Sequence, residues 1–228
     1  MLSFLLKERL MKTDLYASRF FRRGALILVI AAVAVMGAWH AGLFGEGGGA
    51  GQEANFSRGQ EVDGHAGIGG SFILTDQNGR TVTDQTLRGR WMLVYFGYTF
   101  CPDICPTELQ SMSATIKALG ALSGRLAPVF VTIDPARDRP AELAAYLAHF
   151  DPTIIGLTGT EAQISTFARK YHVYYARKGE GKDYSMDHSS YLYLMRPDGS
   201  FDRLFPGGMS PNDLAAALRP ILSEAPHS

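Results

Sequence analysis

Cys101 and Cys105 are the side chains best suited to chemistry in this sequence of 228 residues. They are its only cysteines, and they lie four positions apart in the segment YFGYTFCPDICPTELQ (95–110). Such a pair can be a structural disulfide, a redox-active dithiol or part of a site for a soft metal ion such as Cu(I). A structural disulfide is the weakest of these hypotheses, because closing so short a loop removes little chain entropy.

The residues around the pair predict its place in the fold. Residues 91–97 are apolar and rich in aromatic and branched side chains, which predicts a buried strand. Pro102 and Pro106 then suit the first turn of a helix. If that turn is helical, both cysteines lie on one helix face, where the positive end of the helix favours thiolate over thiol. Apolar residues continue at helical spacing, at Leu109, Met112, Ile116 and Leu119.

Two thiolates need a further ligand to form a metal site. His188 directly precedes the predicted strand SYLYLMR (190–196), and ligands of open α/β sheets gather in loops beyond strand ends. A histidine there can face the cysteine helix, although a loop histidine bonded to Asp187 is the simpler interpretation. The remaining histidines are weaker candidates because of their places in a predicted membrane span, linker, helix end or tail: His40, His65, His149, His172 and His227.

The charges are distributed unevenly along the chain. It carries 22 basic and 22 acidic side chains, and the basic excess falls in residues 1–23. The remainder is mildly acidic, so nucleic-acid binding has no electrostatic support.

Residues 24–44 predict a membrane anchor. They contain no Lys, Arg, Asp or Glu, and about twenty apolar residues suffice to cross a bilayer as a helix. Because Arg22 and Arg23 precede this segment, the tail 1–23 is expected in the cytoplasm and the rest outside it. A cleaved signal peptide is the alternative, but Trp39 and His40 make a poor cleavage site. Met11 is an alternative start that would only shorten the tail.

The rest of the chain predicts one α/β domain after a tether. Residues 45–69 are rich in glycine and polar residues and predict a flexible linker. In residues 70–222 strands alternate with helices, which favours a sheet with helices on both faces, followed by a tail at 223–228. We expect strands at 72–74, 80–82, 91–97, 128–133, 153–157, 173–176, 190–196 and 201–205, a polar loop or hairpin at 177–182, and helices after Pro106, at 140–150, at 160–171 and at 210–222.

Other polar residues near the predicted site have simpler explanations. Asp103 is expected to be a charge in the first helical turn. Asp134 and Asp138 follow a predicted strand, where they can support the site from behind its ligands or simply form a turn.

Four segments together resemble the Sco/SenC family of membrane-anchored copper proteins. They are FGYTFCPDICPTEL (96–109), VTIDPARDRP (131–140), YHVYYA (171–176) and DHSSYLYLMRPDG (187–199). The resemblance covers roughly residues 70–222 and implies a thioredoxin-like fold with added hairpins, preceded by one transmembrane helix. It also implies that Cys101, Cys105 and His188 bind one copper ion, Cu(I) or Cu(II).

The function implied by the resemblance is that of a metallochaperone. Such a protein helps to mature the dinuclear copper centre of cytochrome c oxidase subunit II, and it receives its copper from a donor protein. The expected location is a bacterial inner membrane with the domain in the periplasm; the alternative is the mitochondrial inner membrane, facing the intermembrane space.

Two other functions compete with this hypothesis. A thiol-disulfide oxidoreductase would use Cys101 as the attacking thiolate and Cys105 as the resolving thiol, to reduce the cysteines of the partner copper site. The four-residue separation departs from the shorter spacing of thioredoxin-type sites. A peroxidase is less favoured, because Tyr98 stands where peroxiredoxins carry a threonine.

Overall fold

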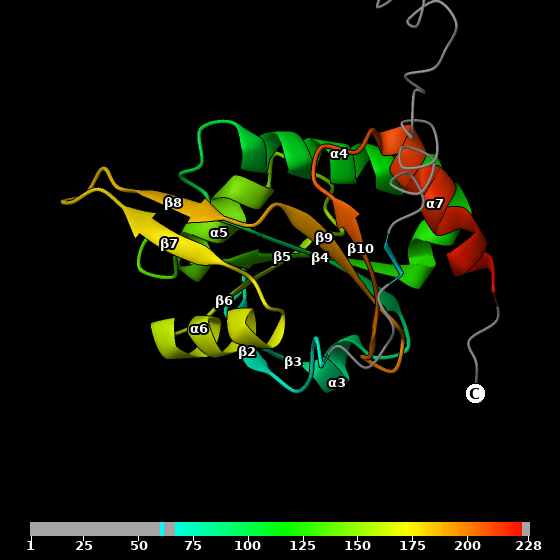
Figure 1. Cartoon of the computed structure of the whole chain (residues 1–228), viewed down its shortest axis with the longest axis horizontal. Helices are drawn as coiled ribbons and strands as arrows, with labels where there is room; N and C mark the ends of the chain where they lie inside the picture. Colours follow the sequence, from blue (N-terminus) through cyan, green and yellow to red (C-terminus); the bar gives the residue numbers. More distant parts are fainter. Residues whose placement is uncertain (1–59, 62–66, 225–228) are drawn as a thin grey trace, which may run out of the picture. The chain divides into compact units, whose positions relative to one another are not determined.

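The computed structural model describes residues 60–61 and 67–224, so the predicted tail 1–23 and anchor 24–44 lie outside the described residues. The described residues form an eight-stranded sheet and a separate two-stranded sheet (Figure 1). The strands are β1 (Gln60–Glu61), β2 (Ile73–Asp76), β3 (Thr81–Thr83), β4 (Trp91–Gly97), β5 (Leu126–Thr132), β6 (Ile155–Thr158), β7 (Tyr175–Lys178), β8 (Ser185–His188), β9 (Tyr191–Met195) and β10 (Phe201–Pro206).

Five α-helices and one 3₁₀ helix accompany these strands in the described part. They are α3 (Asp84–Leu87), α4 (Ile104–Leu119), η1 (Gly120–Arg125), α5 (Pro140–Leu147), α6 (Glu161–Lys170) and α7 (Pro211–Ser223).

Strand β4 lies inside the large sheet, whose order is β1-β10-β9-β4-β5-β6-β2-β3. The strands β4, β5 and β6 are parallel, and every other pairing is antiparallel. Helices α4 and α5 connect the three parallel strands in the same direction, so right-handed crossovers place both on one face. Figure 1 shows α7 beside α4 on that face and α6 on the opposite one. The mixed α/β architecture and the added hairpin agree with the sequence-based expectation.

Neighbouring residues of β4 face the two halves of the core, as the two-residue period of a strand requires. Phe96 packs toward α6, with its ring centroid 5.7 Å from that of Phe167 and 5.5 Å from that of Tyr171. Tyr95 points to the other face, where its ring lies 6.1 Å from Phe130. Both Tyr95 and Phe96 are buried. An apolar segment without alternation therefore forms a strand covered on both faces.

Local sequence signals place several element ends correctly. Thr160 caps α6 through a capping box with Gln163, and Ser210 caps α7 by accepting a hydrogen bond from the Asp213 N–H. The turn between β2 and β3 contains Gly79 with φ +77°, a conformation that suits glycine.

Other boundaries differ from the expected ones. Helix α5 ends at Leu147 rather than at residue 150, and β6 begins at Ile155 rather than at residue 153. The cause of the late strand start is a turn at Asp151, whose carboxylate accepts the N–H of Thr153 at 2.9 Å and whose carbonyl accepts that of Ile154. Strand β5 begins two residues earlier than expected, at Leu126.

The polar segment around residue 180 forms the turn of the β7–β8 hairpin. Tyr175 pairs with His188 and Lys178 with Ser185, so His188 ends a strand instead of lying in a loop. Figure 1 shows this hairpin extending away from the large sheet.

Strand β1 pairs with β10 and lies within the predicted linker 45–69. Within residues 60–61 and 67–224, no helix combines the length and apolar character needed to cross a membrane.

Candidate metal centre

The two cysteines lie where β4 passes into α4. Cys105 is in the first turn of the helix, whereas Cys101 precedes the helix, and both are free thiols. The Cys105 N–H donates to the Cys101 sulfur at 3.4 Å, so the loop folds Cys101 back over the helix end. The condition for a shared helical face is not met, because Asp103 takes the N-cap position instead of the expected place in the first turn and leaves Cys101 outside the helix.

His188, at the end of β8, lies close to Cys105. Its Nε2 atom lies 3.5 Å from the sulfur of Cys105, and its Nδ1 atom lies 3.0 Å from the carbonyl oxygen of Ser189. A carbonyl only accepts, so Nδ1 carries the proton in this arrangement and Nε2 presents its lone pair to the thiol. The backbone thus orients the nitrogen that a metal ion would need.

Burial sets the protonation of both groups. It raises the pKa of the buried Cys105 thiol to about 12, with a further contribution from the neighbouring Cys101. Burial thus opposes the thiolate form that the helix end would favour at Cys105. Burial also lowers the pKa of His188, which favours the neutral imidazole. Burial therefore favours the neutral form of both the thiol and the imidazole.

The floor of the site is part of the sheet. A Cβ atom on Gly97 would lie 2.9 Å from the Cys105 sulfur and 2.8 Å from the Phe130 ring, so only glycine lets the sulfur approach the strand this closely. The rings of Tyr95 and Tyr98 each meet the His188 ring edge-on, at centroid distances of 6.2 Å. The Tyr95 hydroxyl is buried close to Cys105 without a hydrogen bond of good geometry.

This donor set fits a soft metal ion. Two thiols and one imidazole suit Cu(I), and the imidazole nitrogen is free to bind. Among the described residues, no three Cys, His, Asp or Glu side chains converge closely enough to form a ready-made metal cluster. The Cys101 sulfur accepts the backbone N–H of Cys105, and its side chain is half-buried. The role of the three residues as ligands stays a prediction.

Asp138 anchors the cysteine loop through hydrogen bonds. This buried carboxylate accepts hydrogen bonds from the N–H and the hydroxyl of Thr99, at 3.0 and 2.6 Å, and from the hydroxyl of Thr132 at 2.6 Å. It touches neither cysteine, yet it fixes the backbone two residues before Cys101. Asp134 accepts a hydrogen bond from the Tyr184 hydroxyl, at 2.6 Å, and pairs with Arg137, which the sequence patterns did not single out.

The other predicted candidates do not join the site. His149 and His172 are exposed surface residues, and His172 has a positive φ of 53°. His40, His65 and His227 lie outside the described residues. Asp103 is exposed and makes no side-chain hydrogen bond at the helix end.

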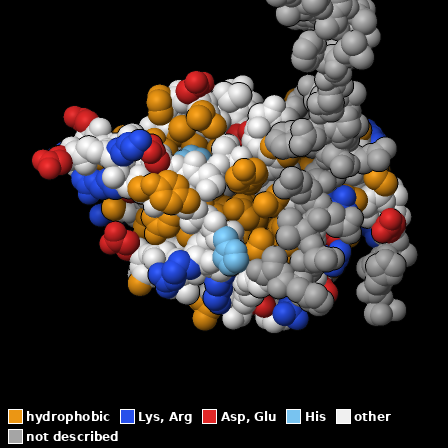
Figure 2. All heavy atoms as spheres, in the orientation of Figure 1, with side chains coloured by type: hydrophobic (Ala, Val, Ile, Leu, Met, Phe, Trp, Pro, Cys, Tyr) orange, Lys and Arg blue, Asp and Glu red, His pale blue; other side chains and the backbone are white. Residues whose placement is uncertain are grey.

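Several large apolar side chains close in sequence to the site residues are exposed to solvent. Phe100 is 62% exposed, Ile104 56% and Tyr191 44%, and all three are within three residues of Cys101, Cys105 or His188. Figure 2 shows hydrophobic side chains gathered on the face that contains the hairpin and the start of α4. Exposed apolar groups of this size are typical of contact surfaces.

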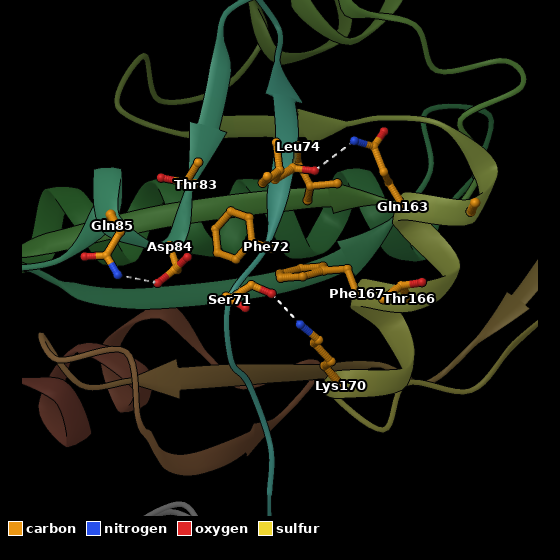
Figure 3. A pocket seen from close by; sticks show the side chains of 12 residues that line it. Ser71, Phe72, Leu74, Thr83, Asp84, Gln85, Gln163, Thr166, Phe167 and Lys170 are labelled. Atoms are coloured by element: carbon orange, nitrogen blue, oxygen red, sulfur yellow. Dashed lines mark hydrogen bonds between the residues drawn. The ribbon is translucent and has the colours of Figure 1, made fainter.

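A hollow of about 680 Å³ lies elsewhere, between α6 and the β2–β3 region (Figure 3). Its walls are largely apolar, with the Phe72 and Phe167 rings in edge contact at 4.9 Å. Neither cysteine nor His188 lines it. It therefore takes no part in the thiol and imidazole chemistry.

Comparisons with known proteins identify the family of this chain. The family model described as SCO1/SenC matches residues 60–223. Protein sco1 of Schizosaccharomyces pombe is 44% identical over 156 residues, which is 66% of this chain and 59% of that protein. The matched part thus spans less than two thirds of this relative.

Two solved structures share the fold. The ScoI protein of Bradyrhizobium japonicum, solved with copper bound, is 43% identical, with a TM-score of 0.63 over 67% of this chain and 98% of that one. BsSco, a protein with a disulfide switch from the Sco family of cytochrome c oxidase assembly proteins, is 26% identical, with a TM-score of 0.60 over 73% and 99%. With its cysteine pair beside a histidine on this fold, the chain belongs to the SCO1/SenC family.

Proposed function

We propose that this protein is a copper metallochaperone that carries one copper ion on Cys101, Cys105 and His188. The single observation that supports this most is the 3.5 Å approach of the His188 Nε2 atom to the Cys105 sulfur, with the Cys101 sulfur at the same helix end. A histidine with its lone pair directed at a thiol is suited to sharing a soft ion with it. The copper bound in ScoI agrees with this cargo.

Loading and release proceed by ligand exchange. Each thiol that coordinates the ion loses its proton to solvent, and the copper leaves one ligand of the donor protein for each ligand that it gains here. The raised pKa of Cys105 means that copper competes with a proton for this sulfur. A site of only three protein ligands leaves room for a ligand of the next protein, which permits delivery.

The recipient that we propose is cytochrome c oxidase subunit II, at its dinuclear copper centre. The assignment of BsSco to oxidase assembly supports this partner class. The apolar rim at Phe100, Ile104 and Tyr191 offers a contact surface at the point of transfer. A membrane anchor at residues 24–44 would hold the domain on the periplasmic side of a bacterial inner membrane, or in the intermembrane space of a mitochondrion.

Copper binding by the reduced full-length protein tests the proposal. The competition is run anaerobically with a chromophoric Cu(I) chelator on the wild type, His188→Ala and His149→Ala, the last being an exposed histidine away from the cysteines. We expect one tightly held Cu(I) per chain in the wild type and in His149→Ala, and a weaker or absent one in His188→Ala. Equal affinity in all three proteins would contradict the histidine ligand, and no binding in the wild type would contradict the chaperone.

A thiol-disulfide reductase is the second candidate function. It is favoured by the half-buried Cys101 next to the buried Cys105, and by the disulfide switch of BsSco. The Cys101 thiolate would attack a partner disulfide, and the displaced partner sulfur would leave as a thiolate. Cys105 would then lose its proton and attack Cys101 in the mixed disulfide. This step releases the second partner thiol, and the two electrons of the Cys101–Cys105 pair pass to the partner. Thiol exchange that survives in His188→Ala without copper binding in any variant would favour this function.

A further inference from the structure

We propose that Arg137 is a positioning residue that ties the β7–β8 hairpin to the cysteine loop and thereby holds His188 against Cys105. The proposal rests on the proposed function, because it concerns the same three ligands. Arg137 itself touches none of them; it acts through the aromatic residues on either side.

The first half of the tie is the contact of Arg137 with the hairpin. Its Nη1 atom donates to the carbonyl oxygen of Tyr184 at 2.9 Å, and its guanidinium lies 3.6 Å from the centroid of the Tyr184 ring. Asp134 joins this contact, because it forms an ion pair with Arg137 and accepts a hydrogen bond from the Tyr184 hydroxyl at 2.6 Å. Two residues that follow β5 therefore bind Tyr184, which immediately precedes β8.

The second half is the contact with the cysteine loop. The same guanidinium lies 4.6 Å from the centroid of the Phe100 ring, which directly precedes Cys101. It also lies 5.8 Å from the Tyr98 ring, whose edge contact with the His188 ring was described above. One planar cation thus touches both segments that supply the metal donors.

The hairpin needs such a tie. The strands β7 and β8 form a sheet of their own, without a ladder to the large sheet in the described structure. A two-stranded hairpin is only marginally stable alone. The side chains of Arg137 and Asp134 are 14% and 4% exposed, so salt and solvent screen their pairing less than they screen a surface ion pair. The tie can therefore hold the end of the hairpin in place.

Lysine cannot replace arginine in this role. The guanidinium is flat, stacks on aromatic faces and donates in its plane at the same time, whereas an ammonium is a compact charge. The two cysteines, by contrast, belong to one loop and one helical turn, and Asp138 anchors that loop through Thr99 independently of the hairpin. Loss of the tie should thus weaken the histidine contribution and leave the thiols unchanged.

The chain offers a matched control in Arg177. This arginine stacks on the same Tyr184 ring, 3.8 Å from its centroid, but it is exposed and hydrogen-bonds the carbonyl oxygen of Gly181. It has no described contact with Phe100 or Tyr98. Arg137→Met and Arg177→Met each remove one cation from the ring, and only the first breaks the link to the cysteine loop.

The experiment compares the full-length wild type, Arg137→Met, Arg137→Lys, Arg177→Met and His188→Ala. Cu(I) affinity is measured by competition, and the Cu(II) forms are compared by absorption and electron paramagnetic resonance. Arg137→Met and Arg137→Lys should lose about 10- to 100-fold in affinity, the range typical for residues that orient a ligand, and their Cu(II) spectra should shift toward that of His188→Ala. Arg177→Met should resemble the wild type.

A copper-free measurement separates this proposal from the proposed function. The ring resonances of His188, assigned by comparison with His188→Ala, are recorded in the reduced metal-free protein. We expect them to shift or broaden in both Arg137 variants and to stay in place in Arg177→Met. Unchanged resonances in the Arg137 variants would overturn the positioning role even if copper binds. If the wild type binds no copper while these resonances respond as expected, the chaperone function fails and the tie stands.

Circular dichroism and thermal unfolding show whether each variant is folded. If Arg137→Met unfolds, Tyr184→Phe replaces it, because this change removes only the hydroxyl bond to Asp134 and keeps the ring stack. It should shift the His188 resonances in the same direction by a smaller amount. No shift in a folded Tyr184→Phe together with none in Arg137→Lys would contradict the proposal.

Discussion

The sulfur of Cys105 and the Nε2 atom of His188 lie 3.5 Å apart, although 83 residues separate the two in the sequence. Cys105 is placed by the junction of β4 and α4, and His188 by the end of the β7–β8 hairpin. Because the β7–β8 hairpin has no ladder to the large sheet among the described residues, their distance depends on the contacts that hold the hairpin against the cysteine loop.

The two cysteines should react with alkylating agents at very different rates. Cys101 is half-buried, whereas Cys105 is fully buried with its pKa raised to about 12. Because the thiolate is the reactive form, iodoacetamide at neutral pH should modify Cys101 at least about tenfold faster than Cys105. Peptide mass spectrometry of the reduced protein gives both rates. In the unfolded protein the rates should become similar, and similar rates in the folded protein would contradict the predicted difference.

Gly97→Ala should disturb the metal site directly. The new Cβ atom would lie 2.9 Å from the Cys105 sulfur and 2.8 Å from the Phe130 ring, so one of them must move. We expect the free energy of unfolding to fall by about 1–3 kcal/mol, as for overpacked cores, and Cu(I) binding to weaken. Urea unfolding and copper competition measure the two effects.

Gly124→Ala is the control for this substitution, because a Cβ there meets no atom within 4 Å. It should change neither property appreciably. A Gly97→Ala protein with wild-type stability and affinity would show that the close approach of the sulfur to the strand is unimportant.

Glu108 should make stability depend on pH. Its carboxyl is buried, one oxygen accepts the Gly208 N–H at 2.8 Å, and the other has no partner in the described structure. Burial raises its pKa, so its contribution to stability is complete below the pKa of the unfolded chain and is lost as pH rises through the folded pKa. Each unit of upward shift corresponds to about 1.4 kcal/mol.

Glu108→Gln removes this titration and keeps an oxygen for Gly208. Its free energy of unfolding should therefore fall less than that of the wild type between pH 4 and pH 8. Part of the decline should remain, since burial also raises the pKa of Asp138. The exposed Glu142→Gln should follow the wild-type curve. Parallel curves for wild type and Glu108→Gln would refute the assignment.

Asp138→Ala should loosen the cysteine loop. The substitution leaves the N–H and hydroxyl of Thr99 and the hydroxyl of Thr132 without their buried acceptor. We expect a loss of roughly 2–4 kcal/mol in the free energy of unfolding, because buried donors without partners are costly. Copper binding should weaken as well, since Thr99 is two residues from Cys101.

Asp198→Ala provides the comparison on the surface. Asp198 also accepts an N–H and a hydroxyl, both from Ser200, but it lies in an exposed turn. Its replacement should cost about 1 kcal/mol or less, because water replaces the lost bonds. Equal losses in the two variants would show that the anchoring of Thr99 is not special.

Much of the scaffold around the site follows from local sequence. The apolar residues of β4 and the prolines that follow predict the strand-to-helix junction that contains the cysteines, and this junction is present. The capping box at Thr160 and the cap at Ser210 predict helix starts. These signals work because each depends on residues within a few positions of one another. The start of β6 is less predictable, since the Asp151 turn takes up the N–H groups of Thr153 and Ile154.

The sequence by itself determined the alternation of strands and helices, the cysteine pair and a short choice of histidine partners. Only the tertiary structure decided that His188 faces Cys105, because that distance joins the start of a helix to a separate hairpin and no local pattern encodes it. It also decided that Cys105 is buried, since the desolvation that raises the pKa of its thiol comes from packing and opposes the helix-end effect that the sequence predicts. The tertiary structure likewise places the Arg137 guanidinium over the rings of Phe100 and Tyr184, which are distant from it in sequence.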